Sequence, residues 1–562
     1  MARPLFKLTS PVLLPALFVC LVLAEVFGQE PANPGRLAQT KEEQLATAPE
    51  GFTLIAVYAD GLKALYSNKA RATSEIRPRC DLILEDGQRF DNVILGEVRH
   101  SPDGRHLAFA MAALDPKGRV LYWNAVHDGK VLDYRADGIR AFTFSPDSSR
   151  LAFTVARGKE VQVYTPNKPD TPGYENVSKL TFSSDSRHLA YGALRSRQRL
   201  FVLDGQTAWS GDMPRCPAPV PIHFSPAFSP DGKSWAFAVS DCQKGWSYYV
   251  NGKAEATSYS ALSPFQFSPD GHHTAYAGAV VKSGLLTVMP QTIGTVVVDG
   301  KESGRYELRL TNPVIVHRRE PGEFNNVNTP RLSLFPENGV TNLNPYYCAV
   351  SNPVYGADGR HLVYRAQLGR AKAIMVVDGQ SGPEFDLVLN DPELSPDGQH
   401  IGYLAMQNQE LLQVLDGKVT SLGNVVPADS FSIAEEPRLA PEGKHFASII
   451  TKSGFGYTAG LAHARRRVLL DGKLEKEYDC MSMSPVQFSS DGEHYAYMVR
   501  GIKDLNGKSL VVVDGFEGPA YDSILGGIDQ KMQGASVTFY AVRDGKLYRV
   551  TDLAPSNPSS SR

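Results

Sequence analysis

Cysteine is scarce in this chain, and its spacing excludes the common metal and disulfide frameworks. Six cysteines occur in 562 residues. No two of them form a CxxC pair, which argues against a zinc ribbon or a redox dithiol. Cys216 and Cys242 are the nearest pair, and they are the candidates for a disulfide in an oxidising compartment. We therefore predict no metal site.

Signatures of the common enzyme sites are also missing. The sequence has no GxSxG, no HExxH, no GxGxxG after a strand and no GxxxxGK[ST]. These are the usual linear motifs of serine hydrolases, zinc proteases, dinucleotide-binding proteins and P-loop proteins, so the sequence does not indicate any of these classes. We predict no catalytic residue and no cofactor. An active site assembled from several repeat units leaves no linear motif, so an enzyme stays an open alternative.

Neither sign of charge dominates, and long apolar runs are almost absent. Lysine and arginine number 58 against 60 acids, which gives no reason to expect nucleic acid as a partner. The long apolar run, Val12 to Ala24, follows Arg3 and Lys7 and precedes small residues, as in a secretory signal peptide over 1–28. We predict a periplasmic or secreted protein with no membrane insertion after signal cleavage, and a linker over 29–50.

A turn motif recurs along the rest of the chain. It reads SPDG or a close variant, followed by a short strand that alternates large and small apolar residues. Asp103 and Asp147 of the first two copies are 44 residues apart, and Asp231 and Asp270 are 39 apart. A period of this length with four short strands per unit is typical of propeller blades. The copies lie at 100–110, 144–154, 182–191, 228–238, 267–277, 356–366, 394–405, 440–450 and 488–498, with a worn copy at 533–541.

The residues of the motif have mechanical roles. Proline presets φ at the first corner of the turn, and glycine takes the positive φ that closes it. Between these turns, Asp-Gly pairs flanked by apolar runs predict tight hairpins, as at Asp378-Gly379 and Asp514-Gly515. Each unit is therefore predicted to be strand, SPDG turn, strand, loop, strand, DG turn, strand.

The alternation of FSPDGxxxAY with VVVDG and GPxYD, as in Val511 to Asp522, resembles the TolB-like, WD40-like β-propeller repeat superfamily of bacterial envelope proteins. The resemblance covers roughly 50–552. It implies an all-β propeller of about ten four-stranded blade units. It implies little about function, because propellers serve as binding modules and as enzymes.

A single ring of this size exceeds the usual range of roughly four to eight blades. We therefore predict two consecutive propellers, the first set of repeats over 51–302 and the second over 353–552. The stretch 303–352 is then a junction or insertion with degenerate strands, and 553–562 a disordered tail. The alternative is one large ring closed by N- and C-terminal strands, because 81–95 and 533–550 supply opposite halves of a unit.

Histidine recurs at one position of the repeat, two residues after the glycine or its equivalent. Because a residue that appears once per unit serves the unit, we interpret these imidazoles as hydrogen-bonding partners of a turn aspartate or a nearby carbonyl. The repeated turn aspartates have the same structural interpretation. The histidines are His106, His188, His273, His361, His400, His445 and His494.

Residues outside the repeat are better functional candidates. The loop 452–467 combines glycines with an aromatic residue, a histidine and an arginine run, which is a common composition of binding surfaces. The stretch 303–352 adds a second basic pair. Other non-repeat histidines are His127, His223 and His317. The predicted binding residues are Tyr457, His463, Arg465, Arg466, Arg467, Arg318 and Arg319.

We predict a non-catalytic binding or scaffold propeller of the periplasm or exterior that engages a protein partner. One alternative is a propeller enzyme, a hydrolase or lyase, that acts on extracellular polysaccharide or peptide. Another is a small-ligand sensor that uses the central channel of the propeller.

Overall fold

The computed structural model describes residues 39–58, 63–68, 79–84, 86–165, 171–213, 226–241, 245–255, 257–282, 291–309, 349–369, 372–408, 410–424, 431–452, 464–525 and 532–553. Within these ranges the chain forms β-strands and two short 3-10 helices, η1 (Pro441–Gly443) and η2 (Lys503–Leu505), and no α-helix. No helix in these ranges is long and apolar enough to span a bilayer. The all-β prediction is confirmed.

One unit shows how the sequence builds each sheet. It consists of β17 (Ala227–Phe228), β18 (Trp235–Asp241), β19 (Gly245–Val250) and β20 (Lys253–Ala254), paired antiparallel in chain order. The SPDG turn joins β17 to β18, and its Gly232 has φ of +72°. An Asn-Gly turn joins β19 to β20, with φ positive at both residues, as a type I′ hairpin requires. The predicted order of strands and turns is confirmed in this unit.

The first half of the chain contains four further sheets. The first has seven strands, β2 (Thr53–Tyr58), β3 (Lys63–Ser67), β4 (Arg79–Leu84), β5 (Arg89–His100), β6 (Leu107–Leu114), β7 (Val120–His127) and β8 (Lys130–Ala136). The next comprises β9 (Gly138–Phe144), β10 (Leu151–Arg157) and β11 (Glu160–Tyr164). A third comprises β12 (Asn176–Val177), β13 (Thr181–Phe182), β14 (Leu189–Arg195), β15 (Gln198–Leu203) and β16 (Gln206–Asp212). The fourth comprises β21 (Ala261–Leu262), β22 (Gln266–Phe267), β23 (Thr274–Lys282), β24 (Gln291–Val298) and β25 (Lys301–Arg309).

The second half continues the pattern. One sheet comprises β26 (Val354–Tyr355), β27 (Leu362–Leu368), β28 (Lys372–Val377) and β29 (Gln380–Ser381). The next comprises β30 (Leu387–Val388), β31 (Glu393–Leu394), β32 (Ile401–Gln407), β33 (Glu410–Leu415) and β34 (Lys418–Asn424). A nine-stranded sheet comprises β35 (Phe431–Leu439), β36 (Phe446–Lys452), β37 (Ala464–Leu470), β38 (Lys473–Leu474), β39 (Tyr478–Met483), β40 (Gln487–Phe488), β41 (Tyr495–Ile502), β42 (Lys508–Val513) and β43 (Phe516–Glu517). The last comprises β44 (Ser523–Leu525), β45 (Met532–Gln533), β46 (Ser536–Arg543), β47 (Lys546–Leu553) and the N-terminal β1 (Gln39–Thr47).

The apolar core is divided into clusters between neighbouring sheets. Between the sheets of β19 and β23, the rings of Tyr248 and Tyr276 lie 4.8 Å apart, and Phe265 lies 4.9 Å from Tyr248. Ala236 and Ala238 are buried in the same cluster. Small residues let the sheets approach, and the aromatic rings fill the space between them. The predicted alternation of large and small residues therefore serves packing between sheets.

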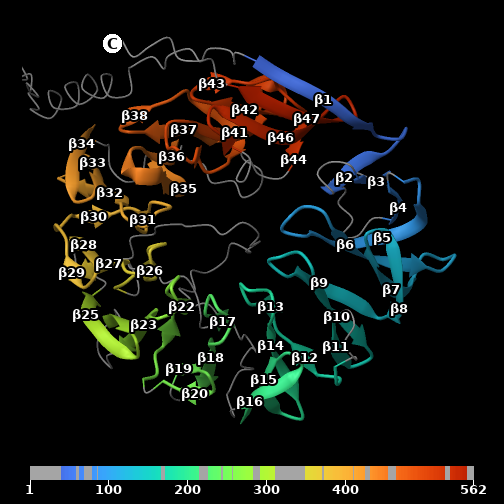
Figure 1. Ribbon diagram of the computed structural model, residues 1–562, viewed down its shortest axis with the longest axis horizontal. Helices are drawn as coiled ribbons and strands as arrows, with labels where there is room; N and C mark the ends of the chain where they lie inside the picture. The colour runs from blue at the N-terminus through green and yellow to red at the C-terminus, as the bar shows by residue number, and fades with distance from the viewer. Residues whose placement is uncertain are drawn as a thin grey trace, which may run out of the picture.

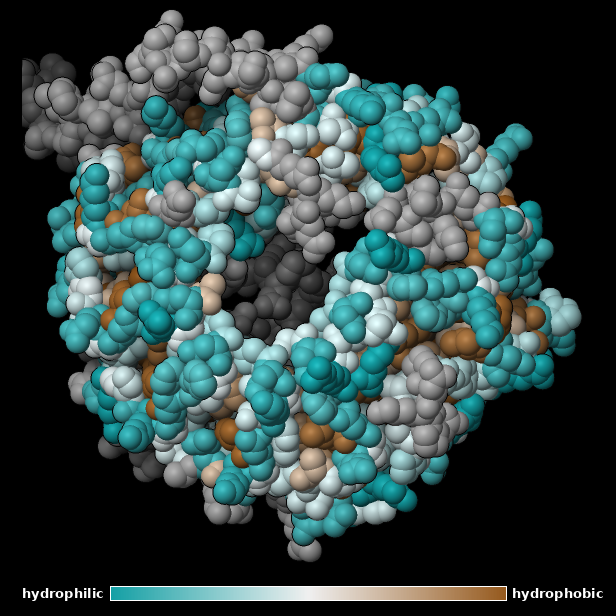
Figure 2. Space-filling model, viewed as in Figure 1, coloured by the Kyte–Doolittle hydropathy of each residue, from teal (hydrophilic) through white to brown (hydrophobic). Residues whose placement is uncertain are grey.

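The sheets lie around one ring, which is hollowed at its centre (Figures 1 and 2). Its two ends meet where β1 pairs antiparallel with β47, from Gln39 opposite Leu553 to Thr47 opposite Lys546. Glu42 of β1 accepts hydrogen bonds from Tyr521 (2.6 Å) and Arg543 (2.9 Å). The segment 29–50 that the sequence analysis assigned to a linker thus contains the strand that closes the ring.

The structure has the alternative arrangement, one ring closed by terminal strands, in place of the two consecutive propellers that the sequence analysis favoured. The sheets before and after 310–348 pack against each other as neighbours. Val296 and Tyr306 share a cluster with Tyr364 and Ile374, and the hydroxyls of Tyr306 and Tyr364 lie 3.2 Å apart. Contacts between sheets leave no linear motif, so the missing repeat in 303–352 was mistaken for a domain boundary.

The ring closure is expected to respond to pH through Asp552. Its carboxyl is buried on β47 and accepts a hydrogen bond from Thr40 of β1 (2.8 Å), and burial raises its pKa from 3.8 to about 6. Between these values the folded chain holds a proton that the unfolded chain releases. The contribution of Asp552 to stability is therefore full at low pH, falls as pH rises from about 4 to 6, and is lost above that.

We predict that the unfolding free energy of Asp552→Asn, relative to that of the wild type, rises by roughly 1 to 3 kcal/mol as the pH increases from 4 to 7. One pKa unit corresponds to about 1.4 kcal/mol. Urea unfolding at several pH values measures this difference. Asp504→Asn, in exposed η2, is the control and should follow the wild type. Parallel pH profiles for Asp552→Asn and the wild type would contradict the assignment.

A second prediction concerns the single ring. A protease site inserted after Arg319, once cleaved, should leave both halves in one particle of full mass, because the Tyr306–Tyr364 cluster and the β1–β47 pairing both join them. Size-exclusion chromatography with light scattering measures this mass before and after cleavage. Release of two folded halves without denaturant would instead favour two independent propellers.

Candidate functional site

The repeated histidines have a shared structural partner. In the part of the chain that the structure describes, seven of them stand just before a strand. Each bonds through Nδ1 to the aspartate of the hairpin turn at the end of the neighbouring strand, which is the second strand after the histidine. The other oxygen of that aspartate accepts the backbone N–H of the residue after the histidine. We call this arrangement the His–Asp clasp. The clasps are His106–Asp128, His188–Asp204, His273–Asp299, His361–Asp378, His400–Asp416, His445–Asp471 and His494–Asp514.

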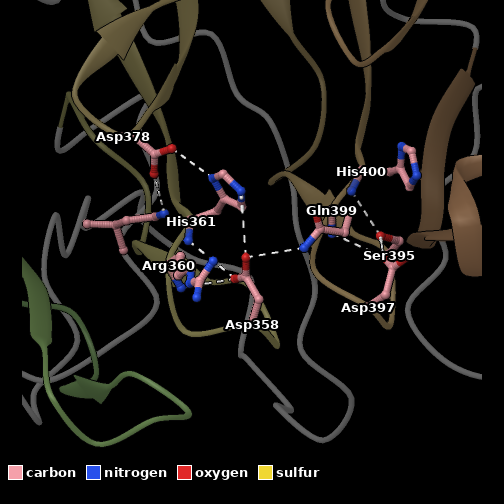
Figure 3. A network of polar contacts seen from close by, with 9 residues as sticks. Asp358, Arg360, His361, Asp378, Ser395, Asp397, Gln399 and His400 are labelled. Carbon is pink, nitrogen blue, oxygen red and sulfur yellow. Dashed lines mark hydrogen bonds and ion pairs between the residues drawn. The ribbon is translucent and has the colours of Figure 1, made fainter.

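Figure 3 shows one clasp and its link to the next unit. Nδ1 of His361 lies 2.8 Å from Oδ2 of Asp378, and Oδ1 of Asp378 accepts the N–H of Leu362 at 2.8 Å. The hydrogen bond to Asp378 raises the pKa of His361. Asp358 of the same unit's turn accepts a long hydrogen bond, 3.4 Å, from Gln399 of the next unit. The clasp therefore ties the start of one strand to the end of its neighbour, and the structural interpretation of the repeated histidines is confirmed.

The turn aspartates also have local partners. Oδ1 of Asp147 accepts hydrogen bonds from the hydroxyl of Ser145 and the N–H of Ser149, and these bonds lower its pKa to about 2. The N–H of Asp147 in turn donates to the hydroxyl of Ser186 in the next unit, at 2.9 Å. Arg150 replaces the repeated histidine here and donates to the carbonyl of Ser186 at 2.9 Å. Turns of neighbouring units are thus bonded to one another, and these bonds stiffen the side of the ring that carries the SPDG turns.

One clasp differs from the others. His127 stands directly before Asp128 in the sequence, and its ring packs against His106 with centroids 5.9 Å apart. Nε2 of His127 is buried and has no hydrogen-bond partner. In the sequence His127 stands outside the repeat position, and the cysteine pattern predicted no metal site. The sequence did contain a signal for this site. The hairpin aspartates Asp378 and Asp514 each follow a valine, whereas Asp128, which also precedes a glycine, follows a histidine.

The predicted binding residues divide between described and undescribed parts of the chain. Arg465, Arg466 and Arg467 begin β37, whereas the others lie outside the described residues. Arg466 turns inward and donates to the carbonyl of Cys480, and Arg467 donates to the carbonyl of Glu475 at 3.0 Å. Arg465 has a side chain that is 64% exposed. The undescribed candidates are Tyr457, His463, Arg318 and Arg319.

Arg465 belongs to a solvent-facing strand surface where β37, β39 and β41 pair side by side. It is opposite Asp479 of β39, and its guanidinium lies 3.4 Å from Glu477. Further along β39, Met481 is 43% exposed. We call the surface of Arg465, Glu477, Asp479, Met481, Lys503 and Leu505 the Arg465 surface. Leu505 is 37% exposed, and Nζ of Lys503 lies 3.5 Å from Asp479, so apolar side chains stand among loosely paired charges.

A partly buried acid directly after β38 was missed by the sequence-based prediction. Glu475 accepts hydrogen bonds from the hydroxyls of Tyr495 and Tyr497, and burial raises its pKa. Three other units make the same backbone bond to the third strand, two through a glycine, Gly382 or Gly518, and one through Glu255. A glutamate where two other units have glycine was the available signal. Through its hydrogen bonds to Tyr495 and Tyr497, Glu475 ties its own unit to the next one.

The cysteines that the structure describes carry no disulfide. Cys80 and Cys480 are both free and buried. Burial raises the pKa of the Cys480 thiol. The proposed partners Cys216 and Cys242 lie outside the described residues, and their pairing stays a prediction.

A small cavity lies between two neighbouring sheets. Its volume is about 270 Å³, and its lining includes Arg150, Val163, Tyr191 and Asp204. Asp204 is already engaged in a clasp, and Tyr191 belongs to the buried cluster between these sheets. The cavity is therefore a feature of the interface between these sheets.

No protein-family model matches the chain. The uncharacterized peptidase YuxL of Bacillus subtilis (strain 168) is 29% identical over 148 residues, which are 26% of this chain and 22% of that protein. The match thus spans about a fifth of the length of this curated relative.

Similar solved structures include β-propellers. The β-propeller domain of the Trilobed protease from Pyrococcus furiosus is 12% identical, over 68% of this chain and 94% of that chain, with a TM-score of 0.25. TolB from Acinetobacter baumannii is 15% identical, over 58% and 79%, with a TM-score of 0.20. A structure titled as the eukaryotic initiation factor is 11% identical, over 82% and 99%, with a TM-score of 0.36. The chain is a β-propeller, as its strand order, its pairing and the ring of sheets in Figure 1 establish.

The clasp predicts an order of stability among variants of Asp378. Asp378→Ala should cost about 1 to 2 kcal/mol of unfolding free energy, because it leaves the N–H of Leu362 and the ring of His361 without their partner. Asp378→Asn should cost less, since Asn251 accepts the N–H of Trp235 in an equivalent place. Urea unfolding measures both, with Glu384→Ala on the exposed surface as control. Equal losses for the alanine and asparagine variants would show that the backbone bond is unimportant.

Proposed function

We propose that the protein is a non-catalytic binding scaffold of the periplasm or exterior that engages a protein partner through the Arg465 surface. The observation that carries this proposal is the exposure of Met481 and Leu505 among Arg465 and Lys503. Exposed apolar residues rimmed by charge are typical of protein-binding sites, and arginine and methionine are enriched in them.

The cations of this surface can exchange their present salt bridges for salt bridges to a bound protein. The pairs Arg465–Glu477 and Lys503–Asp479 are long, 3.4 and 3.5 Å, and both cations are well exposed. Such exposed pairs contribute about 0 to 1 kcal/mol, so giving them up costs little. Carboxylates of a partner can therefore take Arg465 and Lys503 while an apolar side chain covers Met481. The expected partner has an apolar anchor flanked by acidic residues.

The rest of the ring supports a scaffold. The clasps fasten strands within each unit, and the bonds between turns hold neighbouring units together at the same end of the strands. The Arg465 surface includes η2, which lies in the connection between β41 and β42, so it belongs to the other end of the strands. A rigid frame that carries recognition residues on its connections loses little conformational entropy on binding. Tyr457 and His463 precede β37 in the sequence, and their part in partner binding stays a prediction.

We predict that the triple variant Arg465→Ser, Met481→Ser, Leu505→Ser weakens partner binding about ten-fold or more, because it removes the charge and the apolar anchors together. The wild-type chain first captures its partner from the envelope and medium of the source organism, and the purified pair is then measured by calorimetry. Melting temperature should change little, because all three side chains are exposed.

The matched control is Arg99→Ser, Leu121→Ser, Val419→Ser, which removes one exposed arginine and two exposed apolar residues elsewhere on the ring. This control should bind like the wild type. Equal affinity of all three proteins would refute the choice of surface. Cleavage of peptides or glycans by the purified chain would refute the non-catalytic proposal and favour the enzyme alternative, to which the relative named as a peptidase lends some support.

A further inference from the structure

Three groups that bind metal ions come together at the end of β7. His106, His127 and Asp128 each offer one ligand atom, and these atoms all lie within 4.8 Å of one another. His106 immediately precedes β6, His127 ends β7, and Asp128 begins the hairpin turn after it. The group is therefore one His–Asp clasp with a second histidine added.

The second histidine is not needed for the clasp. In the six other clasps the residue directly before the hairpin aspartate is aliphatic, namely Leu203, Val298, Val377, Leu415, Leu470 and Val513. Those clasps have the same hydrogen bonds, so a leucine or valine suffices for the fold at this position. The needs of the fold therefore do not account for the imidazole at this position.

The surroundings of His127 point to a missing ligand. Its ring lies 5.9 Å from the ring of Phe144 and 5.9 Å from that of His106, measured between centroids. Its buried Nε2 has no hydrogen-bond partner, and Oδ2 of Asp128 is 3.6 Å away, beyond hydrogen-bonding distance. A buried polar atom without a partner costs about 1 to 3 kcal/mol. A cation between Nε2 and the carboxylate satisfies both groups.

We propose that His106, His127 and Asp128 form a binding site for one divalent transition-metal ion of the zinc class. Imidazole nitrogens with a carboxylate suit zinc, copper and nickel better than calcium or magnesium. Three protein ligands leave a fourth position for water or a ligand atom of a partner. The site goes beyond the proposed binding function and does not depend on it.

The three ligand atoms lie within 4.8 Å of one another, and the two separations that involve Asp128 are close to what zinc needs. Bonds of about 2.0 to 2.1 Å at tetrahedral angles separate two ligand atoms by about 3.3 Å. The 3.6 Å between His127 and Asp128 is near this value. Nδ1 of His106 and Oδ2 of Asp128 share a hydrogen bond at 2.6 Å, so these two atoms must separate by less than 1 Å as the ion replaces the shared proton, which leaves to solvent.

The side chains can make this adjustment. Those of His106 and Asp128 are 40% and 31% exposed, so their rotamers are not fixed by packing. Oδ1 of Asp128 stays anchored by the N–H of Leu107 at 2.9 Å.

The test is a titration of Zn²⁺ into the full-length chain after removal of metals with EDTA. Calorimetry should give one more Zn²⁺ per chain for the wild type than for His127→Leu, which carries the residue found at three equivalent positions. Co²⁺ in place of Zn²⁺ should give a visible absorption band that the variant lacks. Asp128→Asn should weaken binding at least ten-fold.

His188→Gln is the matched control, because it breaks a clasp that has no second histidine, and it should keep the wild-type stoichiometry. Equal Zn²⁺ binding by the wild type and His127→Leu, or no binding by the wild type at micromolar concentration, would overturn the proposal. Should His127→Leu fail to fold by circular dichroism, His127→Gln decides in the same way. The triple variant of the Arg465 surface should bind Zn²⁺ normally, which separates this site from the proposed function.

Discussion

Hydrogen bonds between β1 and β47 join residues such as Thr40 and Asp552, which are 512 positions apart in the chain. Without this pairing, β47 would present an unpaired edge and the last sheet would lack its outer strand. The side chains repeat a contact found within the ring. Tyr259 donates to Glu302 at 3.0 Å and Tyr478 to Glu517 at 2.7 Å, and at the closure Tyr521 donates to Glu42 of β1. The N-terminal strand thus takes the place that an outer strand has in an ordinary unit.

In each unit, the residues of the repeated contacts lie at one end of the strands and the variable residues lie at the other end. At the end with the SPDG and DG turns, the histidines, aspartates and serines of the repeat bond to one another and to the next unit. These bonds leave the repeated acids and imidazoles engaged, which is why residues common in catalysis here serve the fold. At the other end, the connections differ from unit to unit. The Arg465 surface lies there, where a change of sequence alters recognition without breaking a repeated contact.

The cluster of His106, His127 and Asp128 shows how a repeat can acquire a local chemical property. The clasp already places a histidine beside an aspartate. One further histidine in the adjoining position is enough to bring three ligand groups together, because the hairpin fixes where its ring points. The buried Nε2 of His127 has no counterpart in the clasps that carry an aliphatic residue at this position. A single substitution in one unit therefore separates it chemically from the others.

The sequence by itself determined the all-β fold, the propeller units and the structural role of the repeated histidines, because turns and hairpins depend on residues close together in the chain. SPDG and Asp-Gly specify positive φ at particular positions, and strand alternation follows from local pattern. Tertiary structure alone decided that there is one ring, since the β1–β47 pairing and the Tyr306–Tyr364 contact join distant segments. It also decided which arginine of 465–467 faces solvent, and that His127 stands beside a clasp with its Nε2 unpaired. These outcomes depend on contacts between units, and such contacts leave no signature within any one repeat.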